Sequence, residues 1–522
     1  MAQHVLSNCR SPSLREAPTP RHLPPVRIEL PSEKTEKPST PQRLGLILGL
    51  LVMAQFVVVV DFSIVQIALP TIRSDLGMSL ADLQWIVSAY GLTFAGFLLL
   101  SGRLSDIYGR KRLFMIGLLV FSLSSLAGGL ATSEAVLIAA RVVQGIGAAM
   151  ASATGLALII RIFAPLGRLN QALGVFTAVS SAGFSAGVIL GGVLTEDLGW
   201  RWIFFVNVPI GIVVAALAIK SLPDSAGEKG ARRSLDLPGA ITVTAGLMLL
   251  VYALSEIGNG DSSYVTYLAF ILAGVTLASF IAIEHRSAEP LMPLGFLRRR
   301  TIFFANATAL LTFATNVSMV FLLTAYLQVM QSYSALSAAG ALIPGALVFF
   351  FLGGFGAPRL VKRLGAKPVL VGAMVALSAG MLLFTRISLS SSYVTVILPA
   401  LLVASVGGAL ALTASNIAAL SGANRGEEGI ASGLINTSRQ VGGPVGLAVA
   451  VGVVGLATHG LGVSAPSGEV ITAFRYAFLA AASFAALAVV TSLLLKGKPA
   501  QPSSAGPSVQ VAPPPAEFVR IE

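Results

Sequence analysis

The sequence predicts an all-helical protein that crosses a membrane many times. Charged residues make up 11% of the 522-residue chain, against about 25% in ordinary soluble proteins, and the mean hydropathy is +0.83. Residues 44–496 consist of apolar runs separated by short polar breaks, and about 20 apolar residues are enough for a helix to cross the hydrocarbon. These runs are continuous rather than alternating, which excludes a β-barrel.

Fourteen such helices account for the apolar part of the chain, and polar tails flank it. The tails at residues 1–43 and 497–522 are rich in proline and polar residues, so we predict that they are disordered. The N-terminal tail also lacks the apolar core of a signal peptide. The predicted helices cover residues 44–70, 80–102, 113–132, 135–160, 170–195, 200–221, 236–256, 264–284, 301–330, 336–357, 368–388, 393–420, 429–456 and 470–495.

Lysine and arginine are distributed unevenly between the two sides of the predicted bundle. Nineteen of them lie in loops that follow even-numbered helices, and four lie in loops that follow odd-numbered helices. Because cytoplasmic loops carry the excess of basic residues, both tails are predicted to be cytoplasmic. Trp85, Trp200 and Trp202 then fall at the outer membrane interface, where aromatic belts form.

A faint internal repeat divides the chain. GRLSDIYGRKR (102–112) follows the second helix and GAPRLVKRLGAK (356–367) follows the tenth, and both combine glycine with basic residues before a new helix. If these loops correspond, residues 44–221 and 301–496 are six-helix halves, and residues 222–300 hold an inserted helix pair with its cytoplasmic loops. Two halves in parallel orientation are a transporter architecture.

Several classes of function need residues that this sequence lacks. Cys9 is the single cysteine, and the four histidines lie outside the apolar spans, so no metal site is expected. No GxxxxGK[ST] motif for nucleotide hydrolysis occurs, and we expect neither enzymatic activity nor a cofactor. The excess positive charge lies mostly in short loops and tails, which does not favour nucleic-acid binding.

Three charged residues lie well inside the apolar spans: Asp61, Arg141 and Arg439. A charge at that depth costs at least about 2.5–3.5 kcal/mol, so each is expected to face a partner or a cavity. Asp61 and Arg141 fall in the outer halves of their helices and can share a depth. Burial disfavours charge on a carboxylate while a nearby arginine favours it, which makes Asp61 a candidate for binding and releasing a proton. A static buried ion pair is the alternative, and Arg439 is a possible cavity residue.

Glycines follow one face of the fifth predicted helix, in GFSAGVILGG (183–192). Gly183, Gly187 and Gly191 recur every four residues, with Gly192 beside them. Such a stripe allows another backbone to approach closely. Ordinary helix packing in a polytopic protein is the alternative interpretation.

The segment GRLSDIYGRKR carries more than a topology signal. Gly102 and Gly109 are expected to allow tight turns, and Asp106 is an acid among four basic residues that include Arg110. We expect Asp106 to cap a helix N-terminus, where the helix dipole favours negative charge. This pattern predicts a charge latch that opens when the two halves rock. A topology signal alone would explain the cations but neither the acid nor the glycines.

Taken together, these segments resemble those of one transporter family. GRLSDIYGRKR resembles the helix 2–3 signature of the major facilitator superfamily, RVVQGIGAA (141–149) its helix 4 motif, and GFSAGVILGG the helix 5 motif of its antiporters. DFSIVQIALP (61–70), WRWIFFVNVPIG (200–211) and GIASGLINTSRQVGGPVGLAV (429–449) resemble the fourteen-helix drug:proton antiporter branch. The likeness covers roughly residues 44–496.

The resemblance implies a proton-driven exporter of small, amphiphilic, toxic compounds in a bacterial plasma membrane, acting as a monomer by alternating access. Its implied partners are a small-molecule substrate, protons and the lipid bilayer, with no nucleic acid and no cofactor. By position, Asp61 resembles the proton-coupling acid of that branch and Arg141 its helix 4 arginine. The residues that match the gating loop and the antiporter stripe are Gly102, Asp106, Gly109, Arg110, Gly183, Gly187, Gly191 and Gly192.

The sequence departs from the family pattern at two places. Val188 stands where the antiporter motif has proline, which puts the bend of the fifth helix and the seal against proton leak in question. The second-half loop carries no acid at the position that corresponds to Asp106. A proton-coupled uptake symporter for a metabolite is the first alternative function, although the glycine stripe and the extra helix pair favour export. A membrane-embedded sensor or enzyme is the second.

Overall fold

The computed structural model describes residues 41–223, 236–258, 263–287, 294–424, 427–461 and 465–495, with Met292 and Val463. Residues 45–522 form one compact unit, and residues 1–44 form a separate one. Nearly all of the predicted N-terminal tail, the whole C-terminal tail and most of the loop before residue 236 lie outside the described residues.

Every regular element in the described part of the chain is helical, and fourteen stretches are long and apolar enough to cross a membrane. The prediction of fourteen membrane-spanning helices is therefore confirmed. The helices, with π-helical segments labelled η, are α1 (Pro41–Leu76), α2 (Leu80–Tyr108), α3 (Arg110–Gly129), α4 (Glu134–Phe163), α5 (Leu169–Asp197), α6 (Trp202–Phe205), α7 (Asn207–Ser221), α8 (Leu237–Gly258), α9 (Tyr264–Arg286), α10 (Leu294–Leu297), α11 (Arg300–Ala325), η1 (Tyr326–Met330), α12 (Ala335–Val348), η2 (Phe349–Gly356), α13 (Ala357–Leu364), α14 (Ala366–Phe384), η3 (Tyr393–Ile397), α15 (Leu398–Ser421), α16 (Glu428–Ala457) and α17 (Ser467–Leu493).

Several helices run past their predicted ends. The first was expected to stop at Pro70, but α1 continues through this proline to Leu76, because a membrane helix tolerates proline where neighbours satisfy the freed backbone group. The second was expected to stop at residue 102, but α2 continues to Tyr108. Helix α2 begins at a conventional cap, in which the Ser79 hydroxyl accepts a hydrogen bond from the backbone N–H of Asp82 at 3.0 Å.

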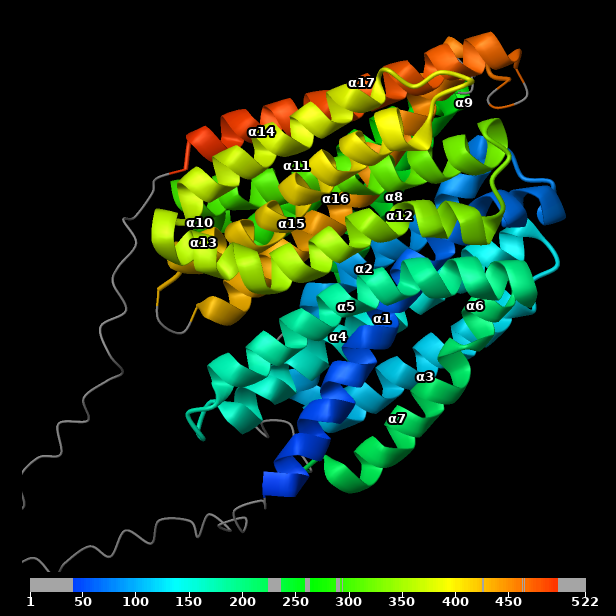
Figure 1. The fold of residues 1–522 in the computed structure, drawn as a ribbon. Coiled ribbons are helices and arrows are strands. Elements are labelled where there is room, and N and C mark those ends of the chain that lie inside the picture. The colour runs from blue at the N-terminus through cyan, green and yellow to red at the C-terminus, as the bar shows by residue number, and fades with distance from the viewer. Residues whose placement is uncertain are drawn as a thin grey trace, which may run out of the picture. The chain divides into compact units, whose positions relative to one another are not determined.

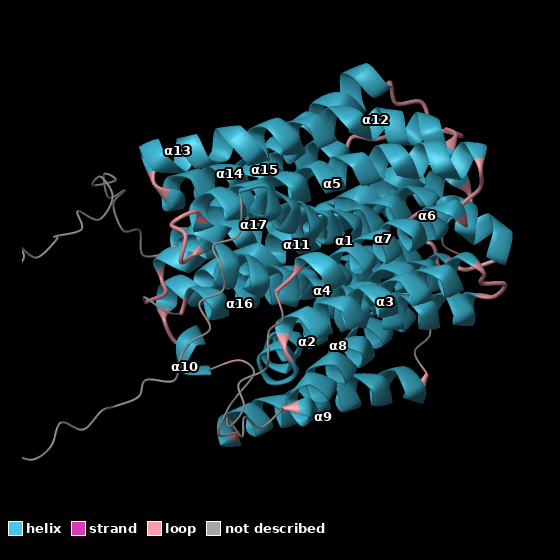
Figure 2. Ribbon diagram, turned by 90° about the horizontal axis from the view of Figure 1, so that it is seen from below, coloured by secondary structure: helices cyan, strands magenta, loops and turns pink. Residues whose placement is uncertain are grey.

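The helices after residue 45 form two halves that lie side by side (Figure 1). Helices α1–α7 make up the N-terminal half, coloured blue to green, and α11–α17 make up the C-terminal half, coloured yellow-green to red. Contacts between the halves join α2 to α16 and α5 to α12. The inserted pair α8–α9 packs on one edge of this arrangement, where α8 contacts both α2 and α16 (Figure 2). Helix α8 therefore bridges the two halves.

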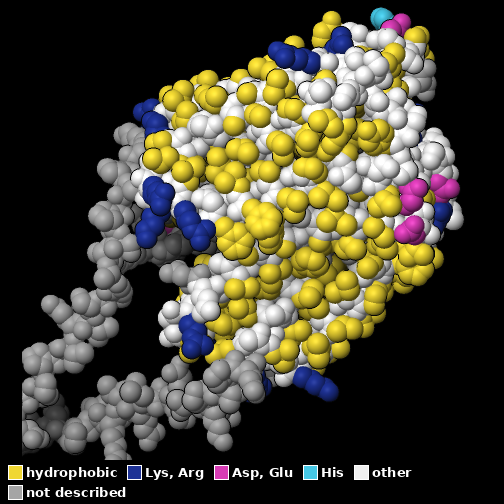
Figure 3. All heavy atoms as spheres, in the orientation of Figure 1, with side chains coloured by type: hydrophobic (Ala, Val, Ile, Leu, Met, Phe, Trp, Pro, Cys, Tyr) yellow, Lys and Arg dark blue, Asp and Glu magenta, His cyan; other side chains and the backbone are white. Residues whose placement is uncertain are grey.

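The two ends of the bundle differ in charge. Lysine and arginine gather at the end where α2 gives way to α3, named here the basic end, while acidic side chains are visible at the opposite end (Figure 3). The latter is named the tryptophan end, because the Trp200 ring nitrogen donates there to Asp75 at 2.9 Å. Apolar side chains cover the flank between the ends (Figure 3), as expected for a lipid-facing surface.

Hydrogen bonds join the halves from the middle of the bundle to the tryptophan end. Gln328 Nε2 donates to the carbonyl oxygen of Ile67 at 2.9 Å, and the Ser185 hydroxyl donates to the carbonyl oxygen of Ala346 at 2.9 Å. At the basic end the surface is hollowed between the two halves (Figure 3). The structure therefore corresponds to a conformation that is closed at the tryptophan end and open toward the basic end.

An ion pair joins two helix starts at the basic end of the C-terminal half. Arg299, just before α11, donates from Nη2 to Oε1 of Glu427, just before α16, at 2.9 Å. Hydrogen bonds from Arg299 and from the backbone N–H of Asn424 lower the pKa of Glu427 to about 2. The same hydrogen bond raises the pKa of Arg299.

Candidate functional site

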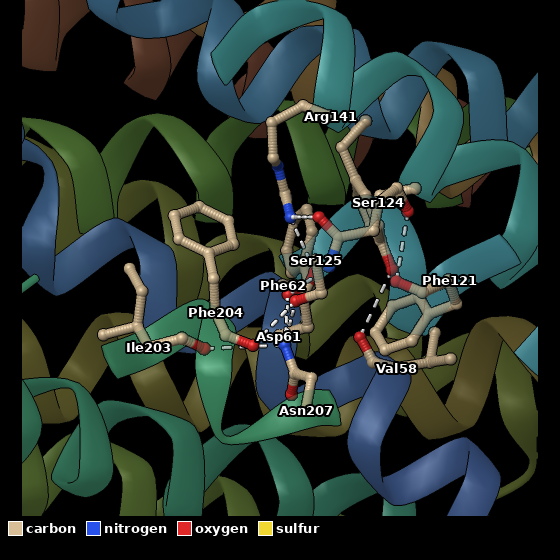
Figure 4. A network of polar contacts seen from close by, with 12 residues as sticks. Val58, Asp61, Phe62, Phe121, Ser124, Ser125, Arg141, Ile203, Phe204 and Asn207 are labelled. Carbon is tan, nitrogen blue, oxygen red and sulfur yellow. Dashed lines mark hydrogen bonds and ion pairs between the residues drawn. The ribbon is translucent and has the colours of Figure 1, made fainter. Parts of the chain in front are cut away.

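A buried ion pair joins α1 to α4 inside the N-terminal half (Figure 4). Arg141 Nη1 donates to Asp61 Oδ2 at 2.7 Å, and both residues are 0% exposed. The structure thus brings together two residues that the sequence placed at one depth. A buried ion pair is tolerated when further hydrogen bonds satisfy its remaining polar atoms, and both partners have such bonds.

Two amide side chains complete the hydrogen bonding of Asp61. Gln144, one turn after Arg141 on α4, donates from Nε2 to Asp61 Oδ1 at 2.8 Å. Asn207, at the start of α7, donates from Nδ2 to the same Oδ1 at 2.8 Å and to the Ser125 hydroxyl on α3 at 3.1 Å. Helices α1, α3, α4 and α7 are therefore tied together around one carboxylate.

Helix α2 and aromatic rings enclose the guanidinium of Arg141. Its Nε donates to the carbonyl oxygen of Ile86 at 2.9 Å. Its Cζ lies 4.1 Å from the ring centroid of Tyr90 and 5.9 Å from that of Phe204. Cation–π contacts of this kind are worth about 2 kcal/mol when desolvated. The arginine is consequently held from three sides in addition to its carboxylate partner.

The hydrogen bonding of this network depends on the protonation state of Asp61. Every partner of Asp61 among the described residues is a donor, which suits an ionised carboxylate because that group only accepts. Protonation would add an O–H donor and remove the charge that neutralises Arg141, so at least one of the present donors would have to turn away. Asn207 Oδ1 is buried and has no hydrogen-bond partner in the described part of the chain. Rotation of this amide would offer the new O–H an acceptor.

Three members of the network were missed by sequence reasoning: Gln144, Tyr90 and Asn207. Gln144 follows Arg141 by three residues, which places both on one helix face, so its position was an available signal. Asn207 is an amide within the apolar run WRWIFFVNVPIG, and it could have been found as a polar group that needs a buried partner. Tyr90 gives no such signal, because an aromatic residue in an apolar helix is ordinary.

The segment 102–112 differs from the predicted loop. It is helical on both sides of a single break at Gly109, whose φ of 94° lies in the region that favours glycine. Gly102 lies inside α2 and makes no turn, so that prediction is wrong. Asp106 does not cap α3, because the N-cap position is Gly109 and carries no side-chain hydrogen bond. Instead Arg110 Nη2 donates to Asp106 Oδ1 at 2.9 Å across the break.

The corresponding segment of the C-terminal half repeats this backbone. Helix α13 ends at Leu364, Gly365 has a φ of 87°, and α14 begins at Ala366. The repeat identified in the sequence is therefore a structural one. Arg110 also donates to the carbonyl oxygen of Ala157 on α4 at 3.4 Å, so the first-half break is tied to the helix that carries Arg141.

The glycine stripe of α5 is a contact surface for α1. A β-carbon at Gly187 would lie 2.8 Å from the carbonyl oxygen of Val60, and one at Gly191 would lie 2.8 Å from that of Ile64. Gly183 faces α1 one turn earlier. Such distances leave no room for a side chain, so these glycines let α5 lie directly on the helix that carries Asp61.

Gly192 and Val188 lie beside this stripe. Gly192 faces the other half of the molecule, where a β-carbon would lie 3.2 Å from the carbonyl oxygen of Ala335 on α12. Val188 is 3% exposed in the apolar core, and α5 runs without interruption from Leu169 to Asp197. Helix α5 therefore contacts α1 on one face and the partner half on another.

Arg439, the third predicted charge, lies on α16 in the C-terminal half and is not part of the Asp61 network. It is 6% exposed, and its Nη2 donates to the carbonyl oxygen of Leu412 at 2.8 Å and to the Ser415 hydroxyl at 3.0 Å. Among the described residues, no group of three or more His, Cys, Asp and Glu side chains is placed to hold a metal ion.

The structure combines two similar helical halves, an inserted helix pair and a buried charge network. These are the features of a multi-pass membrane transporter. The sequence profile of the Major Facilitator Superfamily matches residues 51–447. The chain belongs to this superfamily, as its motifs predicted.

Named relatives extend this finding. The chain is 40% identical over 471 residues to the cephamycin export protein CmcT of Amycolatopsis lactamdurans, covering 89% of this chain and 95% of that protein. It is 37% identical to the puromycin resistance protein pur8 of Streptomyces alboniger, covering 77% of this chain and 80% of that protein. It is 32% identical to the tetracenomycin C resistance and export protein of Streptomyces glaucescens, covering 78% and 74%.

Solved structures match the fold. A bacterial homologue of the human lysosomal transporter Spinster, in an inward-facing and occupied conformation, aligns with a TM-score of 0.61 at 15% identity, covering 88% of this chain and 97% of that one. The nucleoside transporter NupG aligns with a TM-score of 0.60 at 14% identity, covering 87% and 100%. At these identities the likeness concerns the fold.

Proposed function

We propose that this protein exports small, amphiphilic, toxic compounds from a bacterial cell in exchange for protons. The names of its relatives support the export of antibiotics. The observation that supports proton coupling is the fully buried Asp61 at the meeting point of several helices. The basic end is the cytoplasmic side by the positive-inside rule, so both tails are cytoplasmic. In this proposal the protein acts as a monomer in the plasma membrane.

In this proposal the present conformation receives substrate from the cytoplasm. The halves are in contact at the tryptophan end, through pairs such as Gln328 and Ile67, and the hollow at the basic end is the entrance (Figure 3). Rocking of the halves closes that entrance and opens the opposite end. The breaks at Gly109 and Gly365 lie at the basic end, where such a movement is largest.

Proton binding at Asp61 drives one direction of this cycle. Protonation removes the attraction between Asp61 and Arg141, and it requires a donor such as Asn207 to reorient. Both changes loosen α1 against α4 and α7. Helix α1 carries the close contact with the Gly187 face of α5, and α5 contacts α12 of the other half. A change at one carboxylate thus reaches the surface between the halves through two packed helices.

The uptake symporter and the sensor or enzyme are the alternatives. Transport of any compound against its gradient would exclude a function as a sensor or an enzyme. The direction of transport distinguishes export from uptake. The glycine stripe of α5, which packs against α1 at Gly187, favours export because it matches the antiporter motif.

Everted membrane vesicles from cells that express the chain test the proposal. With respiration energising the vesicles, we expect accumulation of at least one of cephamycin, puromycin and tetracenomycin C, and we expect a protonophore to abolish it. Asp61→Asn should abolish accumulation. Asp75→Asn is the matched control, because Asp75 lies on the same helix in a half-exposed ion pair with Arg201. Accumulation that persists without a proton gradient would contradict the coupling, and loss of preloaded compound from the vesicles would favour uptake.

A further inference from the structure

Arg439 is a buried cation without a carboxylate partner. Besides Leu412 and Ser415 it contacts Asn436, to whose Oδ1 its Nη1 donates at 3.4 Å. These acceptors are all neutral, and no carboxylate of the described residues forms an ion pair with Arg439. Its Nε has no acceptor among the described residues. Arg141, by contrast, is neutralised directly by Asp61.

This arrangement leaves binding capacity unused. A guanidinium has five N–H donors in a planar fork that fits a carboxylate with two parallel hydrogen bonds. At most three of the donors of Arg439 are engaged by the described residues, and one of those bonds is long. A charge at this depth is retained where it faces a cavity or a partner, and within the described chain the partner is missing.

The neighbours of Arg439 place it beside the space between the halves. Its Cζ lies 5.7 Å from the ring centroid of Phe313 on α11. Helix α11 packs against α15, α16 and α17 of its own half and continues into η1, where Gln328 contacts Ile67 of the other half. Phe313 and Asn316 are half-buried although α11 is surrounded in this way. The helices of its own half therefore do not fully enclose α11 at these two residues.

An unpaired acceptor on α11, Oδ1 of Asn316, lies against α15 one helical turn before Leu412. Asn316 Oδ1 is buried without a hydrogen-bond partner in the described chain. It borders Gly408, where a β-carbon would lie 2.7 Å from this oxygen and 2.6 Å from Cζ of Phe349. Gly408 precedes Leu412, the residue whose carbonyl oxygen Arg439 contacts, by four residues.

Aromatic rings from both halves flank these polar groups. The ring centroids of Phe349 on η2 and Phe184 on α5 are 5.9 Å apart. A site with apolar walls and a few fixed polar groups is typical of small-molecule binding. Here the polar groups are a cation at Arg439 and an acceptor at Asn316.

We propose that Arg439 binds the carboxylate of an aromatic, amphiphilic substrate. Asn316 Oδ1 accepts a hydrogen bond from an N–H or O–H group of the same molecule, and Phe313, Phe349 and Phe184 contact its apolar part. The substrate class is thus an aromatic acid with a neighbouring donor, such as an acylated amino acid. This inference rests on the proposed export function and assigns its substrate site to the C-terminal half, apart from Asp61.

Equilibrium binding of dansyl-phenylalanine and its methyl ester to the purified full-length protein tests the proposal. Dansyl-phenylalanine carries the aromatic rings, the N–H and the carboxylate, and the ester removes the charge alone. We expect the wild-type protein to bind the acid at least about tenfold more tightly than the ester. Arg439→Gln should weaken binding of the acid by about 30-fold or more and binding of the ester much less. Arg439→Lys should retain part of the preference.

Arg475→Gln is the matched control, because this arginine donates to the carbonyl oxygen of Ile387 at the tryptophan end, outside the proposed site. It should leave both affinities unchanged. Equal binding of acid and ester by the wild-type protein, failure to bind either, or an unchanged preference in Arg439→Gln would overturn the proposal. If Arg439→Gln loses both affinities, the proposal is still supported when Arg439→Lys binds the ester as the wild type does and binds the acid with a reduced preference. Accumulation of an uncharged compound in everted vesicles reports on export separately, so failure of this inference leaves that result standing.

Discussion

Removal of one partner from the Asp61–Arg141 pair should destabilise the protein strongly, because the other partner is then left as an unpaired buried charge. In Asp61→Asn the guanidinium of Arg141 keeps its bond to Ile86 but loses its counterion. The new amide also presents N–H groups to donors from Gln144 and Asn207. Breaking a buried pair in this way costs about 3–5 kcal/mol, and Arg141→Gln should cost a similar amount.

A double-mutant cycle on the free energy of unfolding in mixed micelles measures this coupling. The double variant Asp61→Asn/Arg141→Gln leaves no buried charge at this site, so it should be less destabilised than the sum of the single variants by at least about 2 kcal/mol. The exposed pair Asp75–Arg201 serves as the control and should show a coupling of about 0.2–1 kcal/mol. Additive losses at Asp61 and Arg141, or a coupling no larger than in the control, would refute the argument.

Three further predictions follow from the backbone and the basic end. Gly187→Leu should abolish transport and lower the yield of folded protein, because α1 occupies the space at this position, whereas Gly174→Leu has free space and should do neither. Gly109→Ala should lower the free energy of unfolding by about 1 kcal/mol or more because of its positive φ, while Gly102→Ala, inside α2 with free space, should raise it slightly. Since the pKa of Glu427 falls from 4.5 to about 2 on folding, its stabilising contribution is complete above pH 4.5 and is lost as the pH falls through 2. The difference in melting temperature between the wild type and Glu427→Gln should decrease over that interval, and a constant difference would contradict it.

The fold was largely predictable because the bilayer imposes a length on each helix. Fourteen apolar runs of sufficient length correspond to fourteen membrane-spanning stretches in the described part of the chain, and the repeat around Gly109 and Gly365 located the two halves. The helix ends were less predictable. Hydropathy detects where a segment leaves the hydrocarbon but not where its helical hydrogen bonds stop, so the polar helical turns up to Tyr108 were mistaken for a loop.

The charged residues of the candidate site were predictable from the sequence, and its uncharged residues were less so. Asp61 and Arg141 were found because an intramembrane charge is costly and needs a partner. Asn207 carries no charge, so its burial is cheaper and its signal weaker, and its approach to Asp61 depends on how α7 packs. Gly192 was grouped with the stripe because it stands beside Gly191, yet a shift of one residue turns it by about 100° around the helix, from α1 to the other half.

Proton release on substrate binding tests the proposed coupling most directly. Purified wild-type protein and Asp61→Asn are mixed, in weakly buffered solution with a pH indicator, with the antibiotic that everted vesicles accumulate. We predict that the wild-type protein releases protons on binding and that Asp61→Asn binds the antibiotic without releasing them, while Asp75→Asn behaves as the wild type. Release by Asp61→Asn at the wild-type stoichiometry would show that another group carries the proton and would contradict the assignment of Asp61.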